Sequence, residues 1–107
     1  MRMAAAATLQ ALGDPSRHAI VELLRNGERP VGELVENLSL SQPAVSKHLR
    51  VLKEAGIVEA RADAQRRVYR IRPEPFVELD AWLAGYRRLW DMHLDRLEDH
   101  LDRERDR

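Results

Sequence analysis

The sequence lacks cysteine altogether, has five aromatic residues in 107, and contains no long apolar run. Without cysteine there are no disulfides, thiolate metal ligands or cysteine nucleophiles. No stretch of 18 or more apolar residues is present, so no segment qualifies as a transmembrane helix. The start, MRMAAAATLQ, lacks the apolar core and cleavage pattern of a signal peptide. We therefore expect a cytoplasmic protein that does not enter a membrane.

Catalytic motifs are missing as well. The sequence shows no glycine-rich phosphate loop, no HExxH pair, no nucleophile elbow and no assembled Ser/His/Asp set, so we do not expect an enzyme. It also lacks internal repeats and any linker rich in Pro, Gly or Ser, which predicts one domain over residues 1–103. The last residues, 104–107, contain no apolar side chain and are expected to form a disordered tail.

The net charge of zero conceals an uneven distribution. Residues 41–72 carry eight Lys or Arg against three Asp or Glu, a balance of +5, whereas residues 73–107 carry six against ten, a balance of −4. Screening confines charge interactions to about 10 Å at moderate salt, so a local basic region can attract a polyanion despite the neutral total.

The first half of the chain predicts four helices. The alanine-rich segment Met3–Leu12 has high helix propensity. Asp14 followed by Pro15 indicates an N-cap and a first helical turn, and this helix should end near Gly27. Pro30 opens a third, short helix, and a tight turn over residues 39–41 separates it from the fourth.

The fourth helix, SQPAVSKHLRVLKEA, has two contrasting faces. Ser41 is the expected N-cap, and 100° spacing gathers Val45, Leu49 and Leu52 into an apolar stripe that should face the core. The opposite face collects side chains that can donate to bases or phosphates. Its members are Pro43, Ser46, Lys47, Arg50 and Glu54, with Gln42 and Lys53 at its border.

After this helix, IVEARAD and RVYRIR read as two strands joined by a polar turn near residues 63–66. The expected fold is mainly α-helical (α+β), with four helices, two strands and a long final helix. An amphipathic helix with a basic outer face followed by a β-hairpin is the winged helix-turn-helix arrangement.

The segments DPSRHAIVELL, VGELVENLSLSQPAVSKHLRVLKEAGIV and RRVYRI together resemble the ArsR/SmtB-like family of bacterial transcriptional repressors, over roughly residues 9–72. The resemblance implies a homodimeric repressor that binds double-stranded operator DNA. It assigns the reading of the major groove to Gln42, Pro43, Ser46 and Lys47, and contact with neighbouring backbone or minor groove to the wing.

The remaining candidate DNA contacts differ in character. Arg50 and Lys53 lie further along the helix and suit phosphates better than bases. Arg66 and Arg67 at the hairpin tip suit the narrow, negative minor groove. His48 lies nearer the apolar stripe, and packing and phosphate contact are equally consistent with its position. The predicted DNA-binding set is Ser41, Gln42, Pro43, Ser46, Lys47, His48, Arg50, Lys53, Arg66 and Arg67.

The last helix, expected from Pro75 to about Arg103, has apolar residues at three- and four-residue steps along its whole length. So small a domain has too little core of its own to cover such a face, and we expect a partner helix to cover it. Burial against the winged domain alone is the alternative. In the family that the chain resembles, the first and last helices form the dimer interface. The predicted interface comprises Leu9, Leu12, Leu79, Leu83, Tyr86, Trp90, Leu94 and Leu97.

Metal sensing, a trait of many members of that family, is not expected. The stretch Glu33–Leu38 contains none of the cysteines found in the family's thiolate site. Asp91, His93 and His100 superficially resemble the family's second site, but the two histidines are seven residues apart, about 10 Å along a helix. An intersubunit histidine site and a winged helix serving only protein interaction are the alternatives. Any effector, whether a small molecule or a partner protein, is left open.

Overall fold

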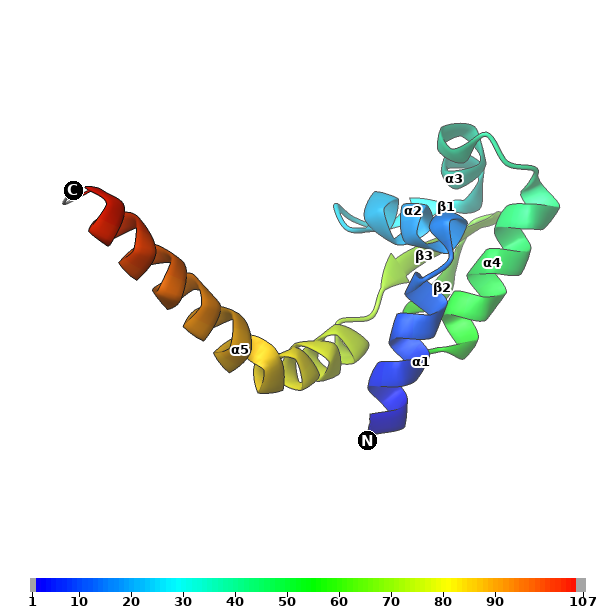
Figure 1. The fold of residues 1–107 in the computed structure, drawn as a ribbon. Coiled ribbons are helices and arrows are strands. Elements are labelled where there is room, and N and C mark those ends of the chain that lie inside the picture. The colour runs from blue at the N-terminus through cyan, green and yellow to red at the C-terminus, as the bar shows by residue number, and fades with distance from the viewer. Residues whose placement is uncertain (1, 106–107) are drawn as a thin grey trace.

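The structure, a computed structural model, describes residues 2–105 and contains five helices and three strands within that range. In chain order they are α1 (Arg2–Leu12), α2 (Pro15–Leu24), β1 (Arg29–Pro30), α3 (Val31–Leu38), α4 (Gln42–Glu54), β2 (Val58–Asp63), β3 (Arg66–Ile71) and α5 (Glu74–Arg105). The mainly helical winged helix-turn-helix fold expected from the sequence is confirmed (Figure 1).

Local sequence signals set the ends of the helices. The Asp14 carboxylate accepts a 3.0 Å hydrogen bond from the backbone N–H of Arg17, and Pro15 stands in the first turn of α2. This hydrogen bond is the main reason that the pKa of Asp14 lies below its usual value. At the end of α3, Ser39 adopts a left-handed conformation with φ of 55°, which turns the chain toward α4.

The three strands form one antiparallel sheet in the order β1-β3-β2. The hairpin pairs Val58 with Ile71 at its base and Asp63 with Arg66 at its tip. Strand β1 is an addition to the expected order, because only two strands were predicted. Its two residues, one of them proline, are too few to show alternation, and their pairing with Tyr69 and Val68 depends on residues far along the chain.

The core lies between the helices and the sheet. Fully buried side chains come from α2, α3, α4 and the start of the sheet: Ile20, Leu34, Val45, Leu49, Leu52, Ile57 and Val58. Helix α1 buries its small residues Ala5, Thr8 and Ala11, which lie at three-residue spacing. The apolar stripe predicted on α4 is therefore confirmed as core, which leaves the opposite face of this helix free.

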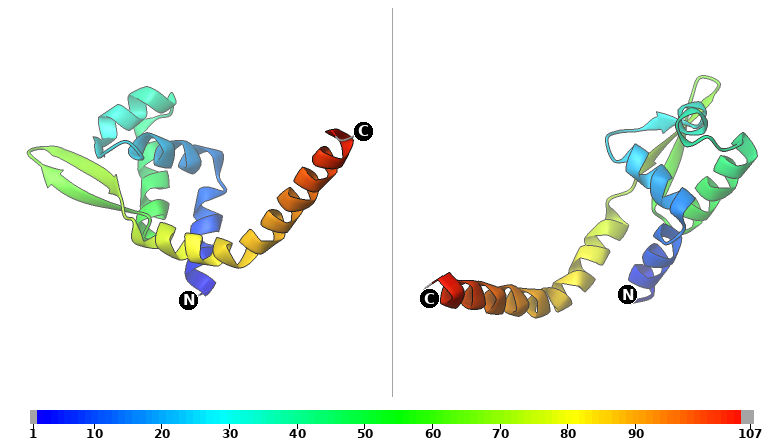
Figure 2. Two further views of the ribbon diagram at one scale, coloured as in Figure 1. Left: turned by 90° about the vertical axis from the view of Figure 1, so that its left-hand side faces the viewer. Right: turned by 45° about the horizontal axis from the view of Figure 1, so that its top comes forward.

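Helix α5 contacts α1 near its start and then leaves the domain (Figures 1 and 2). The molecule consequently measures 67 × 31 × 21 Å. Residues 104 and 105, assigned to a disordered tail from the sequence, belong to this helix, because its regular hydrogen bonding continues past the last apolar residue, Leu101. The other two tail residues lie outside the described range. No helix among residues 2–105 combines the length and apolar character that crossing a membrane requires.

Candidate nucleic-acid interface

The start and end of α4 are both held by specific hydrogen bonds. The Ser41 hydroxyl accepts a 3.2 Å bond from the backbone N–H of Ala44. At the other end, Gly56 has φ of 77°, its N–H donates to Lys53, and the N–H of Ile57 donates to Leu52. This pair of bonds is the Schellman motif, which ends the helix and directs the chain into β2. The orientation of the outward face of α4 is therefore well defined.

That outward face is exposed along its length. Gln42, Pro43, Ser46, Lys47, Arg50, Lys53 and Glu54 are all exposed, as the 100° spacing predicted. Within residues 2–105, no carboxylate lies within 4 Å of Lys47, Arg50 or Lys53. These three cations are free to pair with an external anion.

The arginines of the hairpin differ, because most of them already have partners. Arg66 pairs with Asp63 at 2.8 Å, Arg70 pairs with Glu59 at 2.6 Å, and Arg61 pairs with Glu28. The hydrogen bond from Arg66 lowers the pKa of Asp63, and the hydrogen bond from Arg61 lowers the pKa of Glu28. Arg67, in contrast, is exposed and has no partner among the residues described here. It is the wing cation most available to a ligand.

A groove of about 490 Å³ joins the outward face of α4 to the wing. It brings together four of the predicted residues, two from α4 and two from the wing: Gln42, Ser46, Arg66 and Arg67. Lys47, Arg50 and Lys53 do not line it and lie elsewhere on the α4 surface. The arrangement places uncharged donors at the helix start, beside the guanidinium groups of the hairpin tip. Donors of this kind can reach base edges, while the arginines suit phosphates.

The sequence predicted none of the other seven residues that line this groove, and three of these seven could affect a ligand through an amide or a carboxylate. Gln65 occupies the hairpin turn, a position that the turn prediction itself could have highlighted. Glu33 and Glu36 come from α3, and no local pattern indicates that this helix faces the wing. Glu33 pairs with Arg29 at 3.1 Å, whereas Glu36 has no partner in the part of the chain that the structure describes. A free carboxylate thus stands at the edge of a basic surface.

The comparison with known proteins identifies the family. A family model described as "Bacterial regulatory protein, arsR family" matches residues 14–60, from the N-cap of α2 into β2. Over 94 residues the chain is 45% identical to the HTH-type transcriptional regulator Rv2034 of Mycobacterium tuberculosis, and the alignment covers 80% of this chain and 88% of that protein. The chain belongs to the ArsR family. It is accordingly a DNA-binding transcriptional regulator and not an enzyme.

Two further similarities support this ArsR-family assignment. The HTH-type transcriptional repressor SmtB of Mycobacterium tuberculosis is 46% identical over 68 residues, which cover 64% of this chain and 50% of that repressor. This chain thus matches half the length of that relative. The crystal structure of an ArsR family transcriptional regulator has a TM-score of 0.75 at 31% identity and covers 85% of this chain and 94% of its own. The two folds therefore correspond over most of this chain.

In this ArsR-family chain, His48 faces inward rather than toward the groove. Its side chain is 22% exposed, and its Nδ1 lies 3.8 Å from the Asp14 carboxylate at the start of α2. That nitrogen is buried and has no hydrogen-bond partner among the residues that the structure describes. Of the two roles that the sequence left open for His48, the geometry supports packing between α4 and α2 over phosphate contact.

Among residues 2–105, no group of three or more His, Asp or Glu side chains lies close enough to hold a metal ion within one chain. His100 has Glu104 at 4.0 Å, one turn along α5. A site completed by a second subunit is not tested by this observation, so the absence of metal binding stays a prediction.

The predicted dimer residues divide into two groups in this ArsR-family structure. Leu12 packs partly against the core of its own domain, and Leu79 and Leu83 are half-buried. Leu9, Tyr86, Trp90, Leu94 and Leu97 are between 42% and 54% exposed. Trp82 lies beside them, with its ring 5.1 Å from that of Tyr86. The second group therefore leaves an apolar surface along α5, with Leu9 of α1 also exposed, that one chain does not cover.

Proposed function

We propose that this chain is a homodimeric transcriptional repressor that acts in the cytoplasm and binds an inverted-repeat operator in double-stranded DNA. The observation that carries the proposal is the α4 surface: three unpaired cations, with Gln42 and Ser46 placed beside the wing arginines. A polar helix face with free cations is suited to DNA because the phosphates supply the missing anions.

In the proposed complex, the start of α4 enters the major groove. Gln42 and Ser46 reach base edges, because residues at the start of a recognition helix lie deepest in the groove. Arg50 and Lys53, further along the helix, contact phosphates, and the wing follows the neighbouring backbone or minor groove. A two-fold dimer then requires half-sites whose centres are about 10 bp apart, or a small multiple of that distance.

The dimer is proposed because α5 has an apolar side that its own chain does not bury. This helix has no buried residue among its 32 positions, yet one side carries leucines and aromatics throughout. Monomeric proteins rarely expose such a continuous apolar surface. A second copy, joined through α1 and α5, covers the surface and sets the distance between the two α4 helices. Analytical ultracentrifugation tests this proposal, and a monomer at tens of micromolar would overturn it.

Selection of binding sequences from a random oligonucleotide pool tests DNA recognition directly. We expect enrichment of an imperfect inverted repeat, bound with an affinity that falls steeply as salt rises, because phosphate contacts release counterions. Enrichment of no sequence, together with weak retention on DNA at low salt, would instead indicate a winged helix used for protein interaction. The genes beside genomic copies of the selected sequence would also indicate what the protein regulates.

We further propose that release from the operator does not depend on a metal ion. The chain has no cysteine, and His93 and His100 are too far apart along one helix to share an ion. Titration of the apo-protein with zinc and related ions should leave operator affinity unchanged. Tight stoichiometric binding that weakens DNA binding, and that His93→Ala or His100→Ala abolishes, would show an intersubunit site instead.

A further inference from the structure

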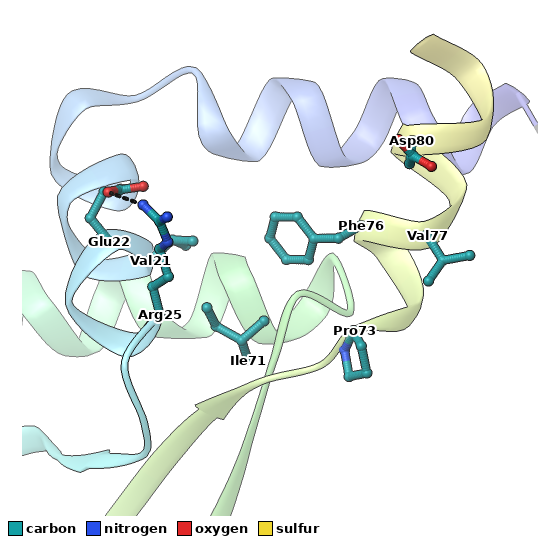
Figure 3. Close-up of a pocket in the computed structure, with 8 residues that line it drawn as sticks. All are labelled: Val21, Glu22, Arg25, Ile71, Pro73, Phe76, Val77 and Asp80. Atoms are coloured by element: carbon teal, nitrogen blue, oxygen red, sulfur yellow. Dashed lines mark ion pairs between the residues drawn. The ribbon is translucent and has the colours of Figure 1, made fainter. Parts of the chain in front are cut away.

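A second groove lies on the side of the domain between α2 and the start of α5. It has a volume of about 660 Å³ and is lined by α2, the end of β3, the following linker and the first turns of α5. Figure 3 shows the ring of Phe76 directed from α5 toward the α2 residues, with Ile71 nearby on the strand. A volume of this size accommodates a small organic molecule, since ligand pockets generally span about 300–1,000 Å³.

The walls of this α2–α5 groove are apolar, and the charges at its rim are already paired. Val21, Ile71, Pro73, Phe76 and Val77 form the walls. At the rim, Arg25 lies 3.6 Å from Glu22, and Asp80 lies 2.8 Å from Arg87. The groove thus presents an aromatic ring and aliphatic carbons to a ligand and leaves no free charge to neutralise one. An uncharged molecule fits this chemistry, because an unpaired ligand charge would lose hydration without compensation.

The same charges disfavour the exposed part of a partner's α5 as the occupant. Residues 91–102 contain five acidic residues and one arginine. The one cation at the rim, Arg25, is already paired with Glu22. Docking that segment here would leave its carboxylates without a free counter-charge, whereas an uncharged small molecule needs none.

The position of the groove connects it to the DNA-binding surface. Strand β3 contributes Ile71 to the groove at one end and carries Arg66 and Arg67 at the other. Helix α5 contributes Phe76 and Val77 and then continues into the proposed dimer surface. A molecule seated between α2 and α5 therefore contacts both the winged domain and the helix that spaces the two domains of a dimer.

We propose that the α2–α5 groove is an effector site for an uncharged, largely apolar organic molecule, and that its occupation lowers operator affinity. The regulatory part rests on the proposed function, because it requires a dimer whose two α4 helices are held at one spacing. A molecule wedged between α2 and α5 shifts that spacing away from the operator half-sites. Coupling is reciprocal, so operator DNA must weaken effector binding by the same factor.

The first experiment uses the neutral dye N-phenyl-1-naphthylamine, whose fluorescence rises in apolar surroundings, with the full chain and no DNA. We expect one dye per chain, and Val77→Asp should weaken binding by about tenfold or more, because the new carboxylate must lose water next to the dye. Val77 is 66% exposed, so the variant should fold normally. Ala81→Asp, which adds the same charge to an exposed α5 position outside the groove, is the matched control.

Nuclear magnetic resonance locates the dye independently. Backbone amide signals of Val21, Ile71 and Val77 should shift on addition of dye. Equal loss of binding in Val77→Asp and Ala81→Asp, or shifts confined to residues 86–101, would overturn the site by placing the dye on the exposed stripe of α5. Dye binding only to dissociated monomer would show that the partner chain fills the groove and would likewise overturn the proposal.

The second experiment measures coupling with the operator obtained by selection from the random pool. Saturating dye should lower operator affinity several-fold, operator should lower dye affinity by the same factor, and Val77→Asp should remove most of the effect. Equal dye affinity with and without operator would overturn the regulatory part. A protein that binds the dye at this groove but binds no DNA when dye-free would instead count against the proposed DNA-binding function, so the two failures are distinguishable.

Discussion

Helices α4 and α5 are both amphipathic, but the rest of the chain covers the apolar side of α4 only. The apolar stripe of α4 is fully buried at Val45, Leu49 and Leu52, while its polar face is exposed and carries unpaired cations. Helix α5 differs because its apolar side is exposed together with its charged side. Its charged positions include Asp80 and Arg87, paired at 2.8 Å, while its apolar side chains remain about half exposed.

The difference shows which face of each helix is available to a partner. A buried apolar stripe leaves α4 to interact through polar and charged groups, which suits a polyanion. An uncovered apolar stripe makes α5 suited to another apolar surface, because burial of such area is the main driving force for association. The sharpest tests are therefore substitutions that add a charge to the apolar side of α5 or remove polar groups from the exposed side of α4.

The largest effect is expected from a charge in the α5 stripe. Trp90→Asp should dissociate the dimer, because a carboxylate buried against a partner helix would lack a counter-charge. Loss of two-site binding should then lower operator affinity by about 100-fold or more. Sedimentation and fluorescence anisotropy measure the two effects. Ala81→Asp places the same charge on another side of α5 and should change neither, so equal behaviour of the two variants would contradict the proposed interface.

The next effect separates a core position from a position in the proposed dimer interface. Leu49→Ala should lower the free energy of unfolding by about 2–5 kcal/mol, because it leaves a cavity in a fully buried site. Urea unfolding should show this loss at every protein concentration. Leu97→Ala, at a position that is 47% exposed in one chain, should show a loss that grows with concentration. A concentration-independent loss for Leu97→Ala would place that residue in a contact within the chain.

The elements of this structure that the sequence predicted are those with local signals. Ser41 and Asp14 cap their helices as their residue types indicated, and the α4 stripe is buried as its spacing required. The β1 strand and the Arg61–Glu28 pair were not foreseen, because they join positions more than 30 residues apart. Pairing at that distance depends on how the elements pack, which periodicity does not report.

The sequence also predicted the positions of the candidate DNA-binding residues but not the contacts between them. Periodicity placed Gln42 and Ser46 on the outward face, and the turn prediction placed Arg66 and Arg67 at the tip of the hairpin. Neither could show that Arg66 is engaged by Asp63 while Arg67 is free, since that depends on side-chain geometry at the tip. For the same reason, the acidic edge contributed by Glu36 became evident only from the packing of α3 beside the wing.

A smaller and more selective effect is expected at the start of α4. Gln42→Ala and Ser46→Ala should each lower affinity for the selected operator by about 1–3 kcal/mol and change affinity for random DNA little, because hydrogen bonds to base edges supply discrimination between sequences. Anisotropy titrations on both DNAs measure this. Gln10→Ala, an exposed glutamine on α1, is the control. Unchanged preference in both α4 variants, with fold and dimer intact, would rule out this face as the reading surface.

The two wing arginines should differ from each other. Arg67→Ala should weaken operator and random DNA alike and flatten the logarithmic salt dependence by about one unit for each phosphate that is no longer neutralised. Arg66→Ala should have the smaller effect, because Asp63 already neutralises that guanidinium at 2.8 Å. Asp63→Asn should raise affinity by releasing Arg66. Equal salt-dependence slopes for the two alanine variants would show that the ion pair between Arg66 and Asp63 breaks when DNA binds.

The smallest effect is expected from the free carboxylate at the groove. Glu36 lines the same groove as Arg67 and has no partner among residues 2–105, so in a complex it stands near the phosphates without a counter-charge. Glu36→Gln should raise affinity for operator and random DNA by about twofold per half-site, the factor expected for two unit charges about 8 Å apart in water. The gain should shrink at high salt, because screening weakens the repulsion that the wild-type carboxylate exerts. Glu78→Gln removes the same charge from an exposed position on α5 and should leave affinity unchanged. An equal gain in DNA affinity for Glu36→Gln and Glu78→Gln would mean that the effect comes from the net charge of the protein. The groove would then not contact the DNA backbone.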